Sequence, residues 1–223
     1  MKYKLQNILK GNKSVYSVYS VGSYLNGEFH ESSDIDLSLI VENPKAEDIM
    51  DLEERIAQLT NETGIKISTC YSEINELKKD ISKLGMHSHG KKRSSFMYDI
   101  LNSEKIYGKE LKIDHIRYSP YEVYSNFSEL ITEIYKHINN PVKCVNLSLV
   151  AAKTTILLKE GRYPTKKKEI IKEFTEKIAK EKGEELNRSY KTKPDIQFLI
   201  DFCYFCKDYS RNYVKVGSYE TIK

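Results

Sequence analysis

The sequence predicts an α/β (α+β) N-terminal domain with a small mixed sheet, followed by an all-α helical bundle. Over roughly the first half of the chain, short stretches rich in β-branched and aromatic residues alternate with helical patterns, which is typical of an α/β unit. From about Pro120 onward, the apolar residues recur only at helical spacing. We therefore expect two domains, residues 1–115 and residues 116–223.

The elements of the first half follow from these patterns. Strands are expected at residues 14–21 (SVYSVYSV), 34–41 (DIDLSLIV) and 65–71 (IKISTCY). Helices are expected at residues 3–10, 45–60, 72–84 and 96–101, with Ser72 as the cap of the third. Residues 22–33 and 85–95 are polar and contain glycine, which predicts loops.

The second half is expected to hold four helices. The first has apolar residues from Val123 to Ile138 and ends before Asn140-Pro141. The second, residues 142–158, is nearly apolar and should lie at the centre of the bundle. The third is capped by Thr165 and buries residues up to Ile178, and the fourth covers about 194–209. The short connections favour a compact bundle.

Composition narrows the class of protein. Hydrophobic residues make up 39% and charged residues 30%, as in soluble globular proteins. No apolar run approaches the roughly 18 residues that span a bilayer, and the N-terminus lacks a signal-peptide pattern, so we expect a cytoplasmic protein with no membrane partner. The net charge of +4 does not by itself favour nucleic acid, although residues 159–193 carry 12 basic and 7 acidic residues.

Cys203 and Cys206 form a CxxC within a helical pattern, FLIDFCYFCKDY. Such a pair can be a redox centre or half of a zinc site. Because the sequence holds no second pair, we favour two small core residues on one helix face.

Chemistry is indicated by Gly22-Ser23 after the first strand and by Asp34 and Asp36 on the second. Glycine lets backbone approach a phosphate closely, and Ser23 offers a hydroxyl and an N–H to phosphate oxygens. Residues two apart on a strand project from the same face, so the two carboxylates should lie close together. They would repel each other unless a cation sat between them, and Mg²⁺ prefers a couple of carboxylates plus phosphate oxygens.

Residues 21–41, VGSYLNGEFHESSDIDLSLIV, resemble the signature of the DNA polymerase β-like nucleotidyltransferase superfamily, and the layout is similar to the aminoglycoside and lincosamide nucleotidyltransferases. The resemblance implies that Gly22 and Ser23 hold the triphosphate and that Asp34 and Asp36 are catalytic ligands of Mg²⁺. It implies attack by an acceptor hydroxyl on the α-phosphate, with release of pyrophosphate. ATP is the favoured donor of AMP, a small-molecule hydroxyl is the expected acceptor, and antibiotic resistance is the expected role.

The strand at 65–71 departs from the family pattern. Active members usually carry a third carboxylate there, whereas alternation places Lys66, Ser68 and Cys70 on the site face of this chain. Glu73 lies just beyond and is a weaker candidate. Lys66 either contacts phosphate directly as a point charge, or marks a protein that binds nucleotide without efficient transfer.

Lys92 and Arg93 are also expected to bind the triphosphate, because they stand where a helix should begin and positive charge is unfavourable there. Two other functions stay open. One is a degenerate nucleotide-binding module, and the other is a toxin–antitoxin nucleotidyltransferase that modifies protein or RNA. Nucleic acid is therefore open but not favoured, and the sequence leaves open whether the chain forms a homodimer.

Overall fold

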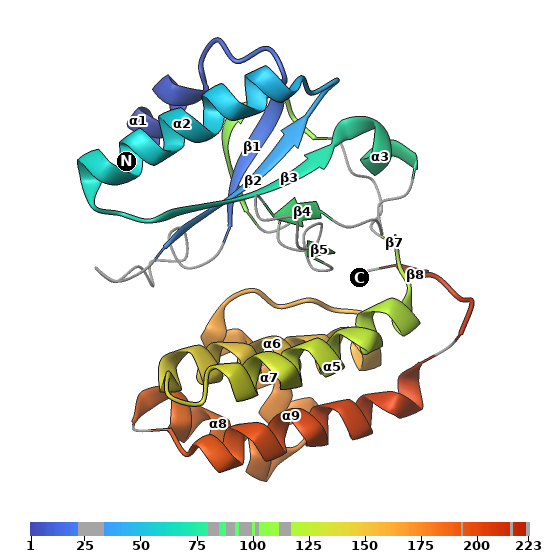
Figure 1. Cartoon of the computed structure of the whole chain (residues 1–223). Helices are drawn as coiled ribbons and strands as arrows, with labels where there is room; N and C mark the ends of the chain where they lie inside the picture. Colours follow the sequence, from blue (N-terminus) through green and yellow to red (C-terminus); the bar gives the residue numbers. More distant parts are fainter. Residues whose placement is uncertain are drawn as a thin grey trace. The chain divides into compact units, whose positions relative to one another are not determined.

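The structure is a computed structural model (Figure 1), and it describes residues 1–21, 34–79, 85–87, 92–93, 100, 103–111, 117–192, 194–214 and 216–221. The chain divides into two compact units, Met1–Ile116 and Arg117–Lys223. The first combines a sheet with helices and the second is almost entirely helical, so the expected fold class is confirmed.

The described strands of the first unit form a six-stranded mixed sheet in the order β5-β4-β3-β2-β1-β6. Their bounds are β1 (Val15–Val21), β2 (Ile35–Val41), β3 (Ile67–Glu73), β4 (Gly85–His87), β5 (Lys92–Arg93) and β6 (Glu104–Gly108). The β2–β3 pair is parallel, and the other pairs are antiparallel. Parallel neighbours need a crossover, which here contains helix α2 (Ala46–Thr63).

Helix α1 (Lys2–Leu9) and α2 cover one face of this sheet (Figure 1). Helix α2 ends at Gly64, whose φ of 68° is in the left-handed region that glycine adopts without strain. The core between helices and sheet contains Leu5, Leu9, Val18, Ile35, Leu37, Leu39, Leu52, Ile56, Leu59 and Ile106. The alternate residues of β2 therefore face away from α1 and α2.

The expected helix at 72–84 is wrong at its start. Strand β3 continues to Glu73 because it pairs with β2 as far as Val41, and Ser72 is a buried strand residue rather than a helix cap. Helix α3 (Ile74–Lys79) follows, and residues 80–84 lie outside the described residues. The expected loop at 85–95 contains β4 and β5. Of the helix expected at 96–101, only residue 100 is described, and it is helical.

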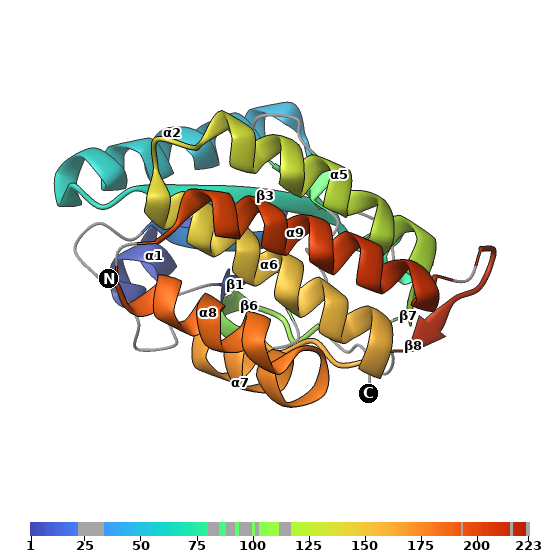
Figure 2. The same ribbon diagram turned by 90° about the horizontal axis from the view of Figure 1, so that it is seen from below.

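The second unit contains five described helices, one more than the sequence predicts. They are α5 (Pro120–Lys136), α6 (Pro141–Glu160), α7 (Lys167–Lys177), α8 (Lys180–Lys191) and α9 (Ile196–Ser210), followed by the 3-10 turn η1 (Arg211–Tyr213). Strands β7 (Arg117–Tyr118) and β8 (Glu220–Thr221) pair at the ends of the unit. Helix α6 packs against α5, α7, α8 and α9, as Figure 2 shows from below, so its expected central place is confirmed.

The additional helix is α8. The sequence predicts one helix through Ile178, whereas α7 ends at Lys177 and the chain turns at Ala179 into α8. Most of the twelve residues of α8 are polar or charged, and the buried ones are Gly183, Leu186 and Ser189, so its apolar signal is weak. The N-cap of α7 is Lys166, without a side-chain hydrogen bond, and the expected Thr165 cap is wrong.

Within the part of the chain that the structure describes, α6 is long and apolar enough to cross a membrane by length and composition. However, 61% of its apolar window is buried inside the protein. Its position among four other helices accounts for this composition, since a helix that is apolar on all sides packs on all sides.

Candidate functional site

Asp34 and Asp36 flank Ile35 at the start of β2. Ile35 belongs to the core beneath α1 and α2, so strand alternation places Asp34 and Asp36 on the opposite face of the sheet. The two positions are about 6.6 Å apart along the strand. Val21, the last residue of β1, pairs with Asp36. Gly22 and Ser23 follow Val21 in the chain but lie outside the described residues.

The parallel register brings the start of β3 beside the same two carboxylates. Ile35 pairs with Ile67 and Asp36 pairs with Ser68. Ile67 packs against the core, which leaves Lys66 and Ser68 on the face of the aspartates. The backbone N–H of Ile35 donates to the carbonyl of Lys66 at 2.8 Å, and this bond holds the Lys66 backbone next to Asp34.

Lys66 forms an ion pair with Asp34. Its Nζ donates to Asp34 Oδ2 at 2.7 Å, with 70% of the lysine side chain and 38% of the aspartate side chain exposed. Exposed pairs of this kind add only about 0–1 kcal/mol to folding stability. The pair is therefore accessible to a ligand and contributes little to the fold. The sequence places Lys66 near the aspartates but does not predict this contact, which depends on the β2–β3 register.

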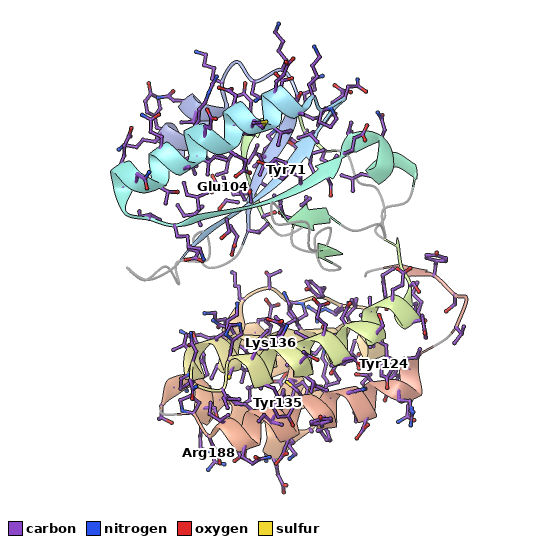
Figure 3. All side chains as sticks on the ribbon, in the orientation of Figure 1. Tyr71, Glu104, Tyr124, Tyr135, Lys136 and Arg188 are labelled. Atoms are coloured by element: carbon purple, nitrogen blue, oxygen red, sulfur yellow. The ribbon has the colours of Figure 1, made fainter. Side chains whose placement is uncertain are left out.

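Among the described residues, neither Glu73 nor Glu53 lies on this face as a third carboxylate. Glu73 pairs with Val41, five positions beyond Ser68, which is about 16 Å along the strand. Glu53 of α2 lies on the other face, where its Oε1 accepts hydrogen bonds from Thr69 and Tyr71. Figure 3 labels Tyr71 on β3; burial and the Glu53 carboxylate raise the pKa of its hydroxyl, which remains a donor.

The donor set fits magnesium only in combination with a ligand. Among the described residues, no group of three or more His, Cys, Asp or Glu side chains could hold a metal ion. Asp34 and Asp36 supply two carboxylates. Mg²⁺ is bound in proteins through one or two carboxylates together with substrate phosphates, so the pair suits an ion that arrives with a triphosphate.

Lys92 and Arg93 do not begin a helix, which corrects the reason for selecting them. They form β5, which pairs with β4 at the far end of the sheet order from β1 and β6. The argument from the helix dipole therefore fails, since a strand has only a small net dipole. Their side chains are outside the described part of the structure, and binding of triphosphate by them stays a prediction.

The CxxC of α9 is part of the core. Cys203 and Cys206 are both buried and free, and burial raises the pKa of the Cys203 thiol to about 12 and that of Cys206 well above its ordinary value. The reactive form of cysteine is the thiolate, so these protonated thiols suit packing and not redox chemistry. The interpretation as two core residues is confirmed.

The helical unit also contains a buried acidic residue that the sequence does not single out. The Glu173 side chain is 8% exposed and accepts from Arg162 at 3.0 Å and from Lys177 at 3.3 Å. A buried charge is tolerated when it is paired in this way. The sequence does indicate the pair of Glu173 with Lys177, because opposite charges four residues apart on a helix lie side by side.

The mixed sheet presents Asp34 and Asp36 on one strand, next to the end of its antiparallel neighbour β1, which is the arrangement that the sequence signature implies. Residues 3–112 match the sequence profile of the family described as Polymerase beta, Nucleotidyltransferase. Residues 3–112, which make up nearly all of the first unit, therefore carry the sequence pattern of a DNA polymerase β-like nucleotidyltransferase domain.

Among solved structures, the chain is similar to the spectinomycin adenyltransferase AAD(9) from Enterococcus faecialis, determined with ATP and spectinomycin. The match has a TM-score of 0.62 and 14% identity, and it covers 94% of this chain and 97% of that one. At this identity the likeness shows a shared fold. A search of curated proteins gave no match.

Proposed function

We propose that this protein transfers a nucleoside monophosphate from a Mg²⁺-bound nucleoside triphosphate to a hydroxyl of a small molecule. The observation that carries the proposal is the placement of Asp34 and Asp36 on one face of β2, within a unit that carries the sequence pattern of a nucleotidyltransferase domain. ATP is the favoured donor and an aminoglycoside-like compound the favoured acceptor, because the structural relative was solved with ATP and spectinomycin. The proposed location is the cytoplasm, and the proposed role is antibiotic resistance.

In the proposed reaction, the acceptor oxygen forms a bond to the α-phosphorus, the bond from that phosphorus to the bridging oxygen breaks, and pyrophosphate leaves. The acceptor proton passes to solvent. Asp34 and Asp36 hold the cation, and Gly22, Ser23, Lys66, Lys92 and Arg93 are proposed to bind the triphosphate. When bound, Mg²⁺ neutralises phosphate charge and aligns the attacking and leaving oxygens.

The test uses the full chain with ATP labelled at the α-phosphate, Mg²⁺ and a panel of aminoglycosides and aminocyclitols. We expect one or more labelled acceptors and stoichiometric pyrophosphate in the wild type. The double variant Asp34→Ala, Asp36→Ala should lose both, and calorimetry should show loss of Mg²⁺-dependent ATP binding. The control is Glu42→Ala, Glu47→Ala, which removes two partly exposed carboxylates of the same unit. Unchanged ATP binding in the double aspartate variant would refute the proposal.

The Lys66–Asp34 ion pair favours a second candidate, a module that binds nucleotide without transferring it. Here the ammonium occupies one carboxylate oxygen, and that oxygen is then less available to a metal or to the acceptor proton. The same labelling experiment separates the two functions. A module binds ATP in an Asp34- and Asp36-dependent manner and labels no acceptor, whereas an enzyme does both.

A further inference from the structure

The backbone holds Lys66 and Asp34 side by side, and their side chains form an ion pair. Residue 66 immediately precedes β3 and residue 34 immediately precedes β2, and these two strands run parallel. The Ile35 N–H to Lys66 carbonyl bond, 2.8 Å, sets the two residues side by side. Lys66 Nζ then reaches Asp34 Oδ2 at 2.7 Å.

The contact places a positive charge beside the carboxylate of Asp34. Two neighbouring carboxylates carry a charge of −2 and favour cations between them. With the ammonium of Lys66 on Oδ2, the group of three side chains carries a net −1. A lysine is a compact point charge with three donors, and it binds phosphate oxygens as readily as carboxylates. The cluster therefore already contains one cation before any metal ion binds.

This charge limits the number of divalent ions that the cluster can hold. Sites that bind two metal ions surround them with carboxylates, and the ions lie only about 3.5–4 Å apart. A second divalent ion beside Asp34 would compete with the ammonium for the same carboxylate oxygens and would be repelled by it. A carboxylate offers about four acceptor positions, so Asp34 can still share one ion with Asp36 while it pairs with Lys66.

We infer that the ammonium of Lys66 takes the place of one of two divalent cations, so that the site binds a nucleoside triphosphate with a single metal ion. The Lys66 side chain, 70% exposed, has the freedom to contact the triphosphate while its backbone stays fixed. This inference rests on the proposed nucleotide binding. It does not depend on whether the protein catalyses transfer of the nucleoside monophosphate.

The test counts metal ions in the nucleotide complex of the full chain. Mn²⁺ replaces Mg²⁺, the nucleotide is the non-hydrolysable α,β-methylene analogue of ATP, and free Mn²⁺ is measured by electron paramagnetic resonance. The expected result is one Mn²⁺ per bound nucleotide for the wild type. Lys66→Glu supplies a third carboxylate in place of the ammonium and should bind two. Lys66→Met should still bind one, with about tenfold weaker nucleotide binding from the lost charge-assisted contact.

A matched control is Lys109→Glu. Lys109 is also 70% exposed and pairs with one carboxylate, that of Glu42 at 4.0 Å, so the charge change is the same in a similar setting. This variant should retain one Mn²⁺. The inference is overturned if the wild type binds two, or if Lys66→Glu binds only one. If the wild type binds no nucleotide in the presence of Mn²⁺, both this inference and the proposed function fail. If it binds two Mn²⁺ per nucleotide, this inference fails and the proposed function stands.

Discussion

Helices α7 and α8 approach each other so closely at Gly183 that there is no room for a side chain at this position. A Cβ built at Gly183 would lie 2.2 Å from Thr175 Oγ1, 2.7 Å from Thr175 Cα and 2.9 Å from Thr175 Cβ. Ordinary contacts between carbon atoms are about 3.5–4.0 Å. Gly183→Ala therefore forces α8 away from α7 by roughly 1 Å, because one of the three atoms belongs to the backbone.

Two effects of this substitution oppose each other. Alanine in place of glycine inside a helix stabilises by about 1 kcal/mol. Overpacking a well-packed contact costs about 1–3 kcal/mol and occasionally more, and the distances at Gly183 are at the severe end. We expect a net loss of about 1–2 kcal/mol, which for a chain of this length lowers the Tm by about 2–8 °C.

Calorimetry of the full chain measures this loss, with Glu184→Ala as the control because Glu184 lies next to Gly183 on α8 and is exposed. Combining Gly183→Ala with Thr175→Ala should recover only part of the loss, since the contact with the Thr175 backbone remains. A variant Gly183→Ala that is as stable as the wild type, or more so, would refute the close packing of α7 and α8.

Three further predictions concern buried polar groups. Ser38→Ala should leave the free energy of unfolding unchanged or raise it by up to about 1 kcal/mol, because Ser38 Oγ is buried without a hydrogen-bond partner in the described structure. The control is Ser14→Ala, which removes a hydroxyl that donates to a carboxylate at 2.6 Å and should lower the free energy of unfolding in urea by about 1 kcal/mol. Glu173→Gln should cost about 1–3 kcal/mol in the same assay, because it leaves Arg162 with a weaker partner, and an unchanged midpoint would contradict this. Because burial raises the pKa of Cys203 to about 12, this thiol should resist a thiol reagent at pH 8 in the native protein and react after unfolding.

The elements that the sequence predicts well are those whose signal is local. Strand β2 alternates apolar and polar residues over its first half, so both its place and the common face of Asp34 and Asp36 follow from the sequence. Helix α6 is apolar enough to be assigned to the centre of the bundle, and the Asn140-Pro141 pair that is expected to end the preceding helix also begins this one, with Asn140 as its N-cap.

The features that the sequence does not predict depend on contacts between distant segments. Serine is a favoured helix cap, but pairing of Ser72 with Ile40 of β2 keeps this residue in a strand. Helix α8 has little apolar surface and is held by close approach of Gly183 to Thr175, a contact that adds no apolar residue to the sequence pattern. The Lys66–Asp34 contact needs the parallel register of β2 and β3, because 32 residues separate its two members.

The Lys66–Asp34 contact distinguishes two properties that the sequence signature implies together, namely binding of a triphosphate and transfer of the monophosphate. Binding of a triphosphate requires positive charge that offsets the charge of the phosphates, and in the proposed site Lys66 supplies part of it. Transfer also requires that the acceptor hydroxyl lose its proton, and a lysine ammonium paired with Asp34 cannot accept one. Retained transfer in Lys66→Met would therefore show that proton removal is independent of this strand, whereas transfer that appears only in Lys66→Glu would assign the missing step to position 66. Transfer by the wild-type protein would show that the acceptor proton reaches solvent without a carboxylate base at position 66.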